Sequence, residues 1–246
     1  TVSITPSFSN ICYDGAISLT AQATGGSNVY NSYIWTGPNG FSGIGNPISI
    51  PNATTSNTGT YTVVVIDSAG CMGTGNASVV VGSEINLSVV STQPTVCPGG
   101  TINLTAQVTG GAGGYSYNWT GPNGFTSTLN PVNIPNVSQA NSGIYQVTVT
   151  DANNCVEIGS IDIAVSTPVI VEVTPSQLTV CVGESIELLA NVSGGSGIYS
   201  YQWLGPNGYS STNNPINISS ATLLNSGTYT VTVTDSNGCI GTDVSS

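Results

Sequence analysis

The chain has 246 residues, only 4% of them charged, and all 11 charged side chains are Asp or Glu, with no Lys, Arg or His. A chain without cations cannot neutralise phosphates or anionic headgroups, which excludes nucleic acid and electrostatic membrane attachment as partners. Without His or Lys the chain also lacks imidazole bases, imidazole metal ligands and Schiff-base amines, so we expect neither enzyme activity nor a bound cofactor.

One segment recurs three times at a spacing of 84 residues. It runs from Tyr61 to Cys71, from Tyr145 to Cys155 and from Tyr229 to Cys239. Each copy alternates apolar and polar residues up to an Asp and continues through a small-residue turn to Cys, which predicts a β-hairpin. The period divides the chain into repeats 1–83, 84–167 and 168–246, each large enough to bury a core.

The two ends of the sequence suggest a window on a longer array. Repeat three contains no counterpart of Ile163–Thr167, so its last strand, strand G, is expected to be truncated at the C-terminus. The sequence does not open with the pattern of a secretion signal, so we expect a mature or excised piece. No apolar run reaches 18 residues, so we expect no membrane insertion.

The first repeat predicts short strands separated by turns. In chain order the expected elements are an edge strand at Val2–Pro6, a turn at Cys12–Gly15, a strand at Ile17–Ala21, a glycine-rich loop at Gly25–Asn28, a strand at Tyr33–Trp35, a tight turn at Gly37–Gly40, a strand at Pro47–Pro51 and the hairpin. Repeats two and three follow the same order, and no segment has helical periodicity. About seven short strands in each repeat are typical of a β-sandwich.

Three spaced motifs in each repeat resemble the immunoglobulin fold. Gly-x-x-Ile-x-Leu-x-Ala, a Trp downstream and Asn-x-Gly-x-Tyr-x-Val look like its strands B, C and F. The resemblance implies an all-β chain of three tandem immunoglobulin-like β-sandwich domains in an extended array, with tyrosine corners at Tyr61, Tyr145 and Tyr229. The family's inter-sheet cysteines are replaced by apolar pairs, so packing around the tryptophans must substitute for them. These pairs are Ala21 and Val63, Ala106 and Val147, and Ala190 and Val231, and the tryptophans are Trp35, Trp119 and Trp203.

Two sequence motifs of the repeat resemble those of a narrower group of proteins. Trp-Thr-Gly-Pro-Asn-Gly-Phe and Thr-Val-Thr-Asp-x-Asn-x-Cys resemble tandem repeats of large secreted or cell-surface adhesin-type proteins of Bacteroidota, including those associated with gliding and type IX secretion. This resemblance implies an extracellular or cell-surface location.

Two cysteines in each repeat favour disulfides over a metal site, because no two thiols are closely spaced. In an immunoglobulin sandwich the turn before strand B and the turn after strand F lie at opposite ends, too far apart for a bridge. A head-to-tail array instead brings Cys12 to Cys155 and Cys97 to Cys239, and leaves Cys71 and Cys181 to join the preceding and following units. Two alternatives stay open: free thiols, or bridges within each repeat on a modified topology, which would be Cys12–Cys71, Cys97–Cys155 and Cys181–Cys239.

Other recurring residues are candidates for capping, recognition or modification. Asp67, Asp151 and Asp235 fit an Asx turn better than a calcium site, because the facing turn has no acid in repeat two. Aromatic rings that could contact a surface polysaccharide, or pack structurally, recur in two loops: Tyr30, Tyr115 and Tyr199, and Phe41, Phe125 and Tyr209. Ser68 lies in an Asp-Ser-Ala sequence that resembles an O-glycosylation site of Bacteroidota.

These observations favour an extracellular structural or adhesive protein, a stalk or fibre segment. Neighbouring copies of the repeat would be its partners, with self-assembly into filaments. One alternative is a carbohydrate- or surface-binding module that uses the aromatic loops. A weaker alternative is a set of spacer domains in a secreted hydrolase.

Overall fold

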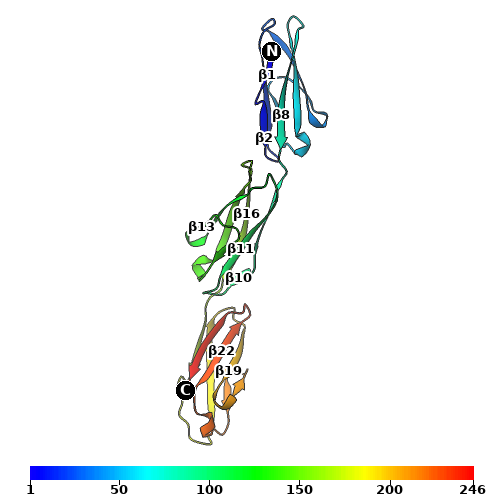
Figure 1. Ribbon diagram of the computed structural model, residues 1–246. Coiled ribbons are helices and arrows are strands. Elements are labelled where there is room, and N and C mark those ends of the chain that lie inside the picture. The colour runs from blue at the N-terminus through cyan, green and yellow to red at the C-terminus, as the bar shows by residue number, and fades with distance from the viewer. The chain divides into compact units, whose positions relative to one another are not determined.

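A computed structural model describes residues 1–246, which form strands and single 3₁₀ turns without an α-helix (Figure 1). No helix has the length and apolar character needed to cross a membrane. The strands form six sheets, two for each repeat.

The first sandwich packs a three-stranded sheet against a five-stranded one. The smaller sheet has the order β1-β3-β6, and the larger has the order β2-β8-β7-β4-β5. The bounds are β1 Val2–Thr5, β2 Phe8–Ile11, β3 Ile17–Ala23, β4 Tyr30–Thr36, β5 Ser42–Ile44, β6 Ile48–Ile50, β7 Gly59–Asp67 and β8 Met72–Val81.

The second and third sandwiches repeat this plan. The second combines the sheets β14-β11-β9 and β10-β16-β15-β12-β13, and the third combines β17-β18-β21 and β20-β19-β22-β23. The bounds in the second are β9 Ile85–Ser91, β10 Thr95–Val96, β11 Ile102–Gly110, β12 Ser116–Gly121, β13 Phe125–Ser127, β14 Val132–Ile134, β15 Gly143–Thr150 and β16 Val156–Val165. Those in the third are β17 Val169–Thr174, β18 Ile186–Gly194, β19 Tyr199–Leu204, β20 Ser210–Ser211, β21 Ile216–Ile218, β22 Tyr229–Asp235 and β23 Ile240–Ser245.

The first strand of the chain changes sheets, which the sequence did not predict. β1 pairs antiparallel with β3, and β2 pairs parallel with β8 in the opposite sheet. Between them the Thr5–Pro6 peptide is cis. Proline, which cannot donate to a sheet ladder, therefore lies where the chain leaves one sheet for the other.

The buried core and the tyrosine corners agree with the resemblance to the immunoglobulin fold. Trp35, Trp119 and Trp203 are fully buried, and the apolar residues at the family's cysteine positions are buried around them. The hydroxyl of Tyr61 donates to the carbonyl of Asn57 at 3.0 Å, and the hydroxyls of Tyr145 and Tyr229 make the equivalent bonds. The all-β class and the tandem immunoglobulin-like sandwiches are confirmed.

The three tryptophans differ in one contact. The indole N–H of Trp35 donates to the carbonyl of Gly45 at 2.9 Å, whereas those of Trp119 and Trp203 are buried without an acceptor. Gly45 has φ of 97°, and Leu129 and Asn213, which take its place in the other repeats, do not have positive φ. A side chain disfavours that conformation, so only the first loop turns a carbonyl toward the indole.

We expect Trp35→Phe to destabilise its sandwich more than Trp119→Phe does, by about 1 kcal/mol. Both substitutions lose packing, but only the first also loses a hydrogen bond, because the indole of Trp119 has no acceptor. Calorimetry of the whole chain, in which the altered sandwich should unfold as an earlier step, measures both losses. Equal losses would contradict the assigned role of the Gly45 contact.

The last strands differ in length between repeats. β8 and β16 have 10 residues each, and β23 has 6. Val79 and Val81, like Ile163 and Val165, are buried near the ends of β8 and β16. The third sandwich has a cavity of about 240 Å³ in this region, with Leu178, Val180 and Tyr229 among its lining residues.

By its contacts the chain forms two compact units that divide the middle repeat. One contains Thr1–Ser88, Ala106–Asn118 and Val147–Gly159, and the other contains Val89–Thr105, Trp119–Gln146 and Ser160–Ser246. The repeat limits at 83 and 167 therefore stay a prediction.

Candidate functional site: two disulfide junctions

In the third sandwich a buried carboxylate closes the hairpin between β22 and β23. One oxygen of Asp235 accepts the backbone N–H groups of Asn237 and Cys239, each at 2.9 Å, and the other accepts the N–H of Ser196 at 2.9 Å. The N–H of Asp235 in turn donates to the carbonyl of Cys239. The carboxylate therefore fixes the position of the cysteine and ties the hairpin to the glycine-rich loop.

The same carboxylate network occurs in all three repeats. Asp67 binds the N–H groups of Ala69, Cys71 and Ser27, and Asp151 binds those of Asn153, Cys155 and Ala112. Each Asp is only 5% exposed. This geometry is the Asx turn that the sequence predicts, extended by one bond to a second loop.

Each of two disulfides joins cysteines of consecutive repeats. Cys12 is bonded to Cys155 with 5.5 Å between the Cα atoms, and Cys97 to Cys239 with 5.4 Å, both inside the range that a disulfide accepts. These are the two pairs that the head-to-tail arrangement predicts. The bridges within each repeat do not occur, because the structure pairs four of the six cysteines across repeats and leaves Cys71 and Cys181 as free thiols.

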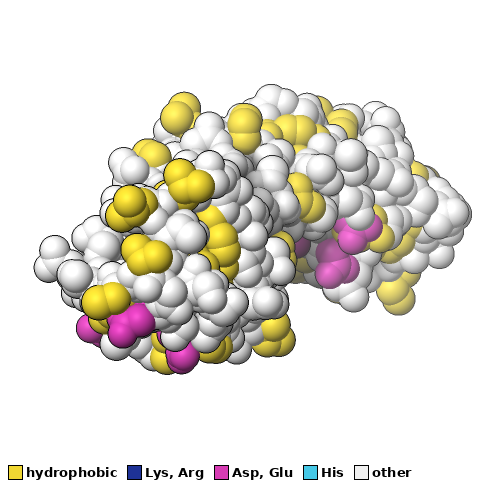
Figure 2. Space-filling view, turned by 90° about the horizontal axis from the view of Figure 1, so that it is seen from below, with side chains coloured by type: hydrophobic (Ala, Val, Ile, Leu, Met, Phe, Trp, Pro, Cys, Tyr) yellow, Lys and Arg dark blue, Asp and Glu magenta, His cyan; other side chains and the backbone are white.

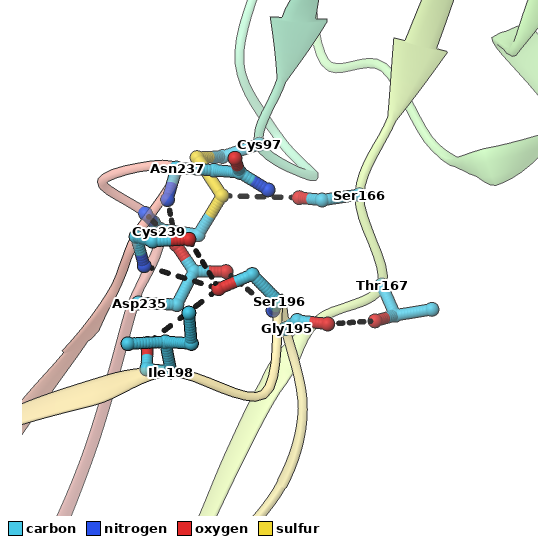
Figure 3. The surroundings of a disulfide bond; sticks show 10 residues. Cys97, Ser166, Thr167, Gly195, Ser196, Ile198, Asp235, Asn237 and Cys239 are labelled. Atoms are coloured by element: carbon cyan, nitrogen blue, oxygen red, sulfur yellow. Dashed lines mark hydrogen bonds between the residues drawn. A yellow bond between two sulfur atoms is a disulfide. The ribbon is translucent and has the colours of Figure 1, made fainter.

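The second disulfide lies beside Ser166 and the hairpin that Asp235 closes (Figure 3). Cys239 is 3% exposed, and the hydroxyl of Ser166 donates to its sulfur at 3.0 Å. Cys97 begins a turn in which the N–H of Gly100 donates to its carbonyl at 2.9 Å, and Gly15 binds Cys12 in the same way at 3.0 Å. Both partners of each bond are thus held by local hydrogen bonds.

Hydroxyls at the ends of the repeats also contact the glycine-rich loops. Thr167 donates to the carbonyl of Gly195 and Ser83 to that of Gly111, each at 3.2 Å. A Cβ on Gly194 would overlap the carbonyl of Pro168, so this loop requires glycine. Sequence reasoning did not identify these hydroxyls, although Ser83 and Thr167 recur at the 84-residue spacing.

The two unpaired cysteines have the same local backbone hydrogen bonds as their bonded counterparts. The N–H of Cys71 donates to Asp67 at 2.8 Å, as that of Cys155 does to Asp151. Cys181 begins a turn like that of Cys97, and its N–H donates to the Glu184 carboxylate at 2.8 Å. Both thiols are exposed.

The hydrogen bonds to the carboxylates change their acidity. In Asp67 the N–H of Ser27 and then that of Cys71 lower the carboxyl pKa. In Asp151 burial alone would raise the pKa, but the N–H groups of Ala112, Cys155 and Asn153 together lower it. Both carboxyls therefore hold their charge more strongly in the folded chain than in the unfolded one.

A depressed pKa makes stability depend on pH in one direction. Asp67 and Asp151 contribute fully to the free energy of unfolding above the unfolded carboxyl pKa of 3.8. This contribution is lost as the pH falls through the lower pKa that each carboxyl has in the folded chain. We expect the melting temperature to stay level from about pH 7 to pH 5 and to fall below about pH 4. Thermal unfolding across this range checks it, and Asp151→Asn should flatten the acid limb. A melting temperature that stays level down to about pH 2 would contradict the prediction.

The candidate ligand aromatics lie half-buried in two sets. Tyr30, Tyr115 and Tyr199 donate their hydroxyls to carbonyls of the glycine-rich loops, at Gly25, Gly110 and Gly194. The other set stacks edge-on against the corner tyrosines, with centroid distances of 5.6–5.7 Å in the pairs Phe41–Tyr61, Phe125–Tyr145 and Tyr209–Tyr229. All six rings therefore have internal contacts that account for their recurrence.

The remaining candidates are the glycosylation site at Ser68 and a metal site. The hydroxyl of Ser68 lies 2.8 Å from that of Ser27 and is exposed, so its glycosylation stays a prediction. No group of three or more His, Cys, Asp or Glu side chains is placed to hold a metal ion.

Comparison with solved structures shows the fold. The chain is similar to the I-band fragment I67–I69 of titin, with 14% identity, a TM-score of 0.57 and 97% and 94% of the two chains covered. It is also similar to the three N-terminal domains of the highly immunogenic outer capsid protein of bacteriophage RB49, with 20% identity, a TM-score of 0.51 and coverage of 100% and 98%. No protein-family model and no curated protein matches the sequence. The chain is thus defined by its tandem immunoglobulin-like fold and by disulfides between repeats.

Proposed function

We propose that this chain is a load-bearing segment of an extracellular stalk or fibre, in which each sandwich is covalently tied to the next. The observation that carries the proposal is the pairing of Cys12 with Cys155 and of Cys97 with Cys239, at sequence separations of 143 and 142 residues. When domains are joined by a peptide linker alone, tension passes through the whole of each domain and can extend it fully. Each of these disulfides instead carries the tension past a segment of the chain, so that this segment is not extended.

The absence of cationic and imidazole side chains supports a structural role over a catalytic one. Stable disulfides favour an oxidising compartment, which fits a cell-surface or extracellular location. The adhesin-type proteins of Bacteroidota that the repeat resembles would provide such a setting.

The free thiols extend the same scheme to further units. Cys71 has the carboxylate-bound hairpin position of Cys155 and Cys239, and Cys181 has the turn position of Cys12 and Cys97. One chain therefore displays one thiol of each type, and Cys181 of one unit is the complement of Cys71 in another. Oxidised glutathione could form the bond: the two thiols lose two protons and two electrons, and the glutathione disulfide is reduced to two thiols.

Controlled oxidation tests the assembly. After treatment with oxidised glutathione, non-reducing electrophoresis should show a series of oligomers, and peptide mapping should recover Cys71 joined to Cys181. The Cys71→Ser variant alone should stay monomeric, because its Cys181 has no complementary thiol, and an equimolar mixture of the Cys71→Ser and Cys181→Ser variants should stop at dimers. Oligomers linked only by pairs of identical cysteines would contradict the head-to-tail scheme.

A further inference from the structure

The two disulfides differ in one neighbouring side chain. The hydroxyl of Ser166 lies 3.0 Å from the sulfur of Cys239 and is the donor, because a disulfide sulfur carries no hydrogen (Figure 3). At the first junction the corresponding position, 84 residues earlier, is Gly82, which has no hydroxyl to offer to Cys155. Only the second disulfide therefore accepts a hydrogen bond at this position.

The backbone around this position is the same at both junctions. The N–H of Ser166 donates to the carbonyl of Val96 at 3.0 Å, and the N–H of Gly82 donates to the carbonyl of Ile11 at 2.9 Å. In each case the residue that accepts this bond immediately precedes the turn cysteine of that junction. The backbone therefore holds position 82 or 166 beside its disulfide, and the side chain is what distinguishes the two sites.

Within each disulfide the two cysteines are unequally protected. The hairpin cysteines Cys155 and Cys239 are 7% and 3% exposed, whereas the turn cysteines Cys12 and Cys97 are half-buried. A dissolved thiol therefore reaches the turn cysteine more readily, and the hairpin cysteine becomes the leaving group. Its departure places a negative charge on a buried sulfur near the hairpin carboxylate, which is unfavourable unless a donor compensates it. Ser166 is such a donor at the second junction.

We propose that the Cys97–Cys239 bond is the thiol-reactive junction of the chain and that Cys97 is the site at which a low-molecular-weight thiol adds. The incoming thiolate sulfur bonds to the sulfur of Cys97, the disulfide breaks, and its electron pair leaves on Cys239 as a thiolate. A hydrogen bond to sulfur strengthens as negative charge develops there, so the hydroxyl of Ser166 lowers the barrier. A second thiolate then attacks the added sulfur, which forms the small-molecule disulfide and leaves Cys97 reduced. The two small thiols are oxidised, and the junction gains their two electrons and two protons.

The charge of the chain selects among thiols. All 11 charged side chains are negative, and Figure 2 shows one side of the molecule on which acidic groups are the only charged ones. A thiolate that also carries a carboxylate is repelled by this field, whereas a cationic amine offsets the charge of its own thiolate. We therefore expect cysteamine to react faster than mercaptopropionate. Added salt should reduce the difference, because it screens the charges.

Partial reduction measures both bonds in one molecule. A Cys71→Ser and Cys181→Ser background removes the free thiols and keeps the two disulfides. After timed exposure to cysteamine, acid stops the exchange. Digestion with pepsin and mass spectrometry then give the fraction of each bond that remains and the cysteine that carries the adduct. We expect the second bond to be lost about three- to tenfold faster than the first, with the adduct on Cys97.

Removal and transfer of the hydroxyl test its role. Ser166→Ala should slow reduction of the second bond about three- to tenfold, and Ser166→Thr, which keeps a hydroxyl, should restore part of the rate. Gly82→Ser should speed reduction of the first bond. The added side chain fits there, because a Cβ on Gly82 would meet only the carbonyl of Ile11, at 3.7 Å. Gly82→Ala is the matched control without a donor, and Thr167→Val removes a hydroxyl that contacts Gly195 rather than sulfur, so neither should reproduce these changes.

The sign of the change separates this role from a merely structural one. If Ser166 only held the junction together, Ser166→Ala would expose the bond and speed its reduction. Faster or unchanged reduction in that variant, equal rates for the two bonds in the parent chain, or an adduct mainly on Cys239 would each overturn the proposal. The reactivity of this bond requires the two disulfides but not the load-bearing role. Failure of glutathione to link Cys71 to Cys181 would therefore contradict the proposed assembly and leave this reactivity standing.

Discussion

A single oxidised chain pulled by its two ends should stop extending at about a third of the length that it reaches after reduction. With both disulfides intact, the shortest covalent path runs from Thr1 to Cys12, crosses to Cys155, returns through the middle repeat to Cys97, crosses to Cys239 and continues to Ser246. At about 3.5 Å per residue the oxidised path measures about 270 Å, and the whole reduced chain measures about 850 Å.

Force spectroscopy with handles at both termini measures these limits directly. Breaking one bond with Cys12→Ala, or the other with Cys97→Ala, should raise the oxidised limit to about 360 Å. Cys71→Ala and Cys181→Ala are the controls, because neither residue lies in a disulfide, and they should not change it. An oxidised chain that extends as far as the reduced one would show that the two bonds do not form in solution, and the load-bearing role would lose its main support.

The mechanical consequence follows from the overlap of the two disulfide loops. Residues 97–155 belong to both loops, so tension in the oxidised chain passes through the middle repeat from Cys155 back to Cys97. The rest of the chain, apart from the short terminal segments, is shielded from extension. In a longer array tied in the same way, tension would pass through the segment between the two cysteines of every repeat, and the bonds would bypass the segments that connect one repeat to the next.

The sequence predicted features that rest on local alternation and on repetition. The hairpins, the buried tryptophans and the corner tyrosines could all be predicted, because each appears three times in the same surroundings. The change of sheets between β1 and β2 could not, because four-residue strands on either side of Pro6 carry too little periodicity. The unequal environments of Trp35 and Trp119 depend on the backbone conformation of one loop residue. A motif that is common to the three repeats does not predict a difference between them.

The candidate sites show a similar division. The pairing of cysteines could be predicted because it depends only on which end of a sandwich each turn occupies. The row of apolar side chains at Ile44, Ile34 and Val64 on the outer face of the first sandwich could not, because strand register brings together residues that are distant in the sequence. The second contact of each Asp, to the glycine-rich loop, likewise joins residues about 40 positions apart.

Removal of the carboxylate of one hairpin should lower both the stability of its sandwich and the yield of the disulfide beside it. Asp151→Ala leaves the N–H groups of Ala112, Asn153 and Cys155 without their acceptor, so we expect a loss of about 1–3 kcal/mol in the stability of the second sandwich. Because the same carboxylate positions Cys155, the yield of the Cys12–Cys155 bond on oxidative refolding should fall.

The Cys97–Cys239 bond of the same molecule provides an internal reference, because Asp235 still holds its hairpin. Peptide mapping after refolding gives the ratio of the two bonds, and calorimetry gives the stability. Asp162→Ala, which removes an exposed carboxylate from β16, is the matched control and should change neither quantity. If Asp151→Ala lowered stability but left the ratio of the bonds unchanged, the carboxylate would support the hairpin without guiding the cysteine. The junction would then assemble through the packing of the turns alone.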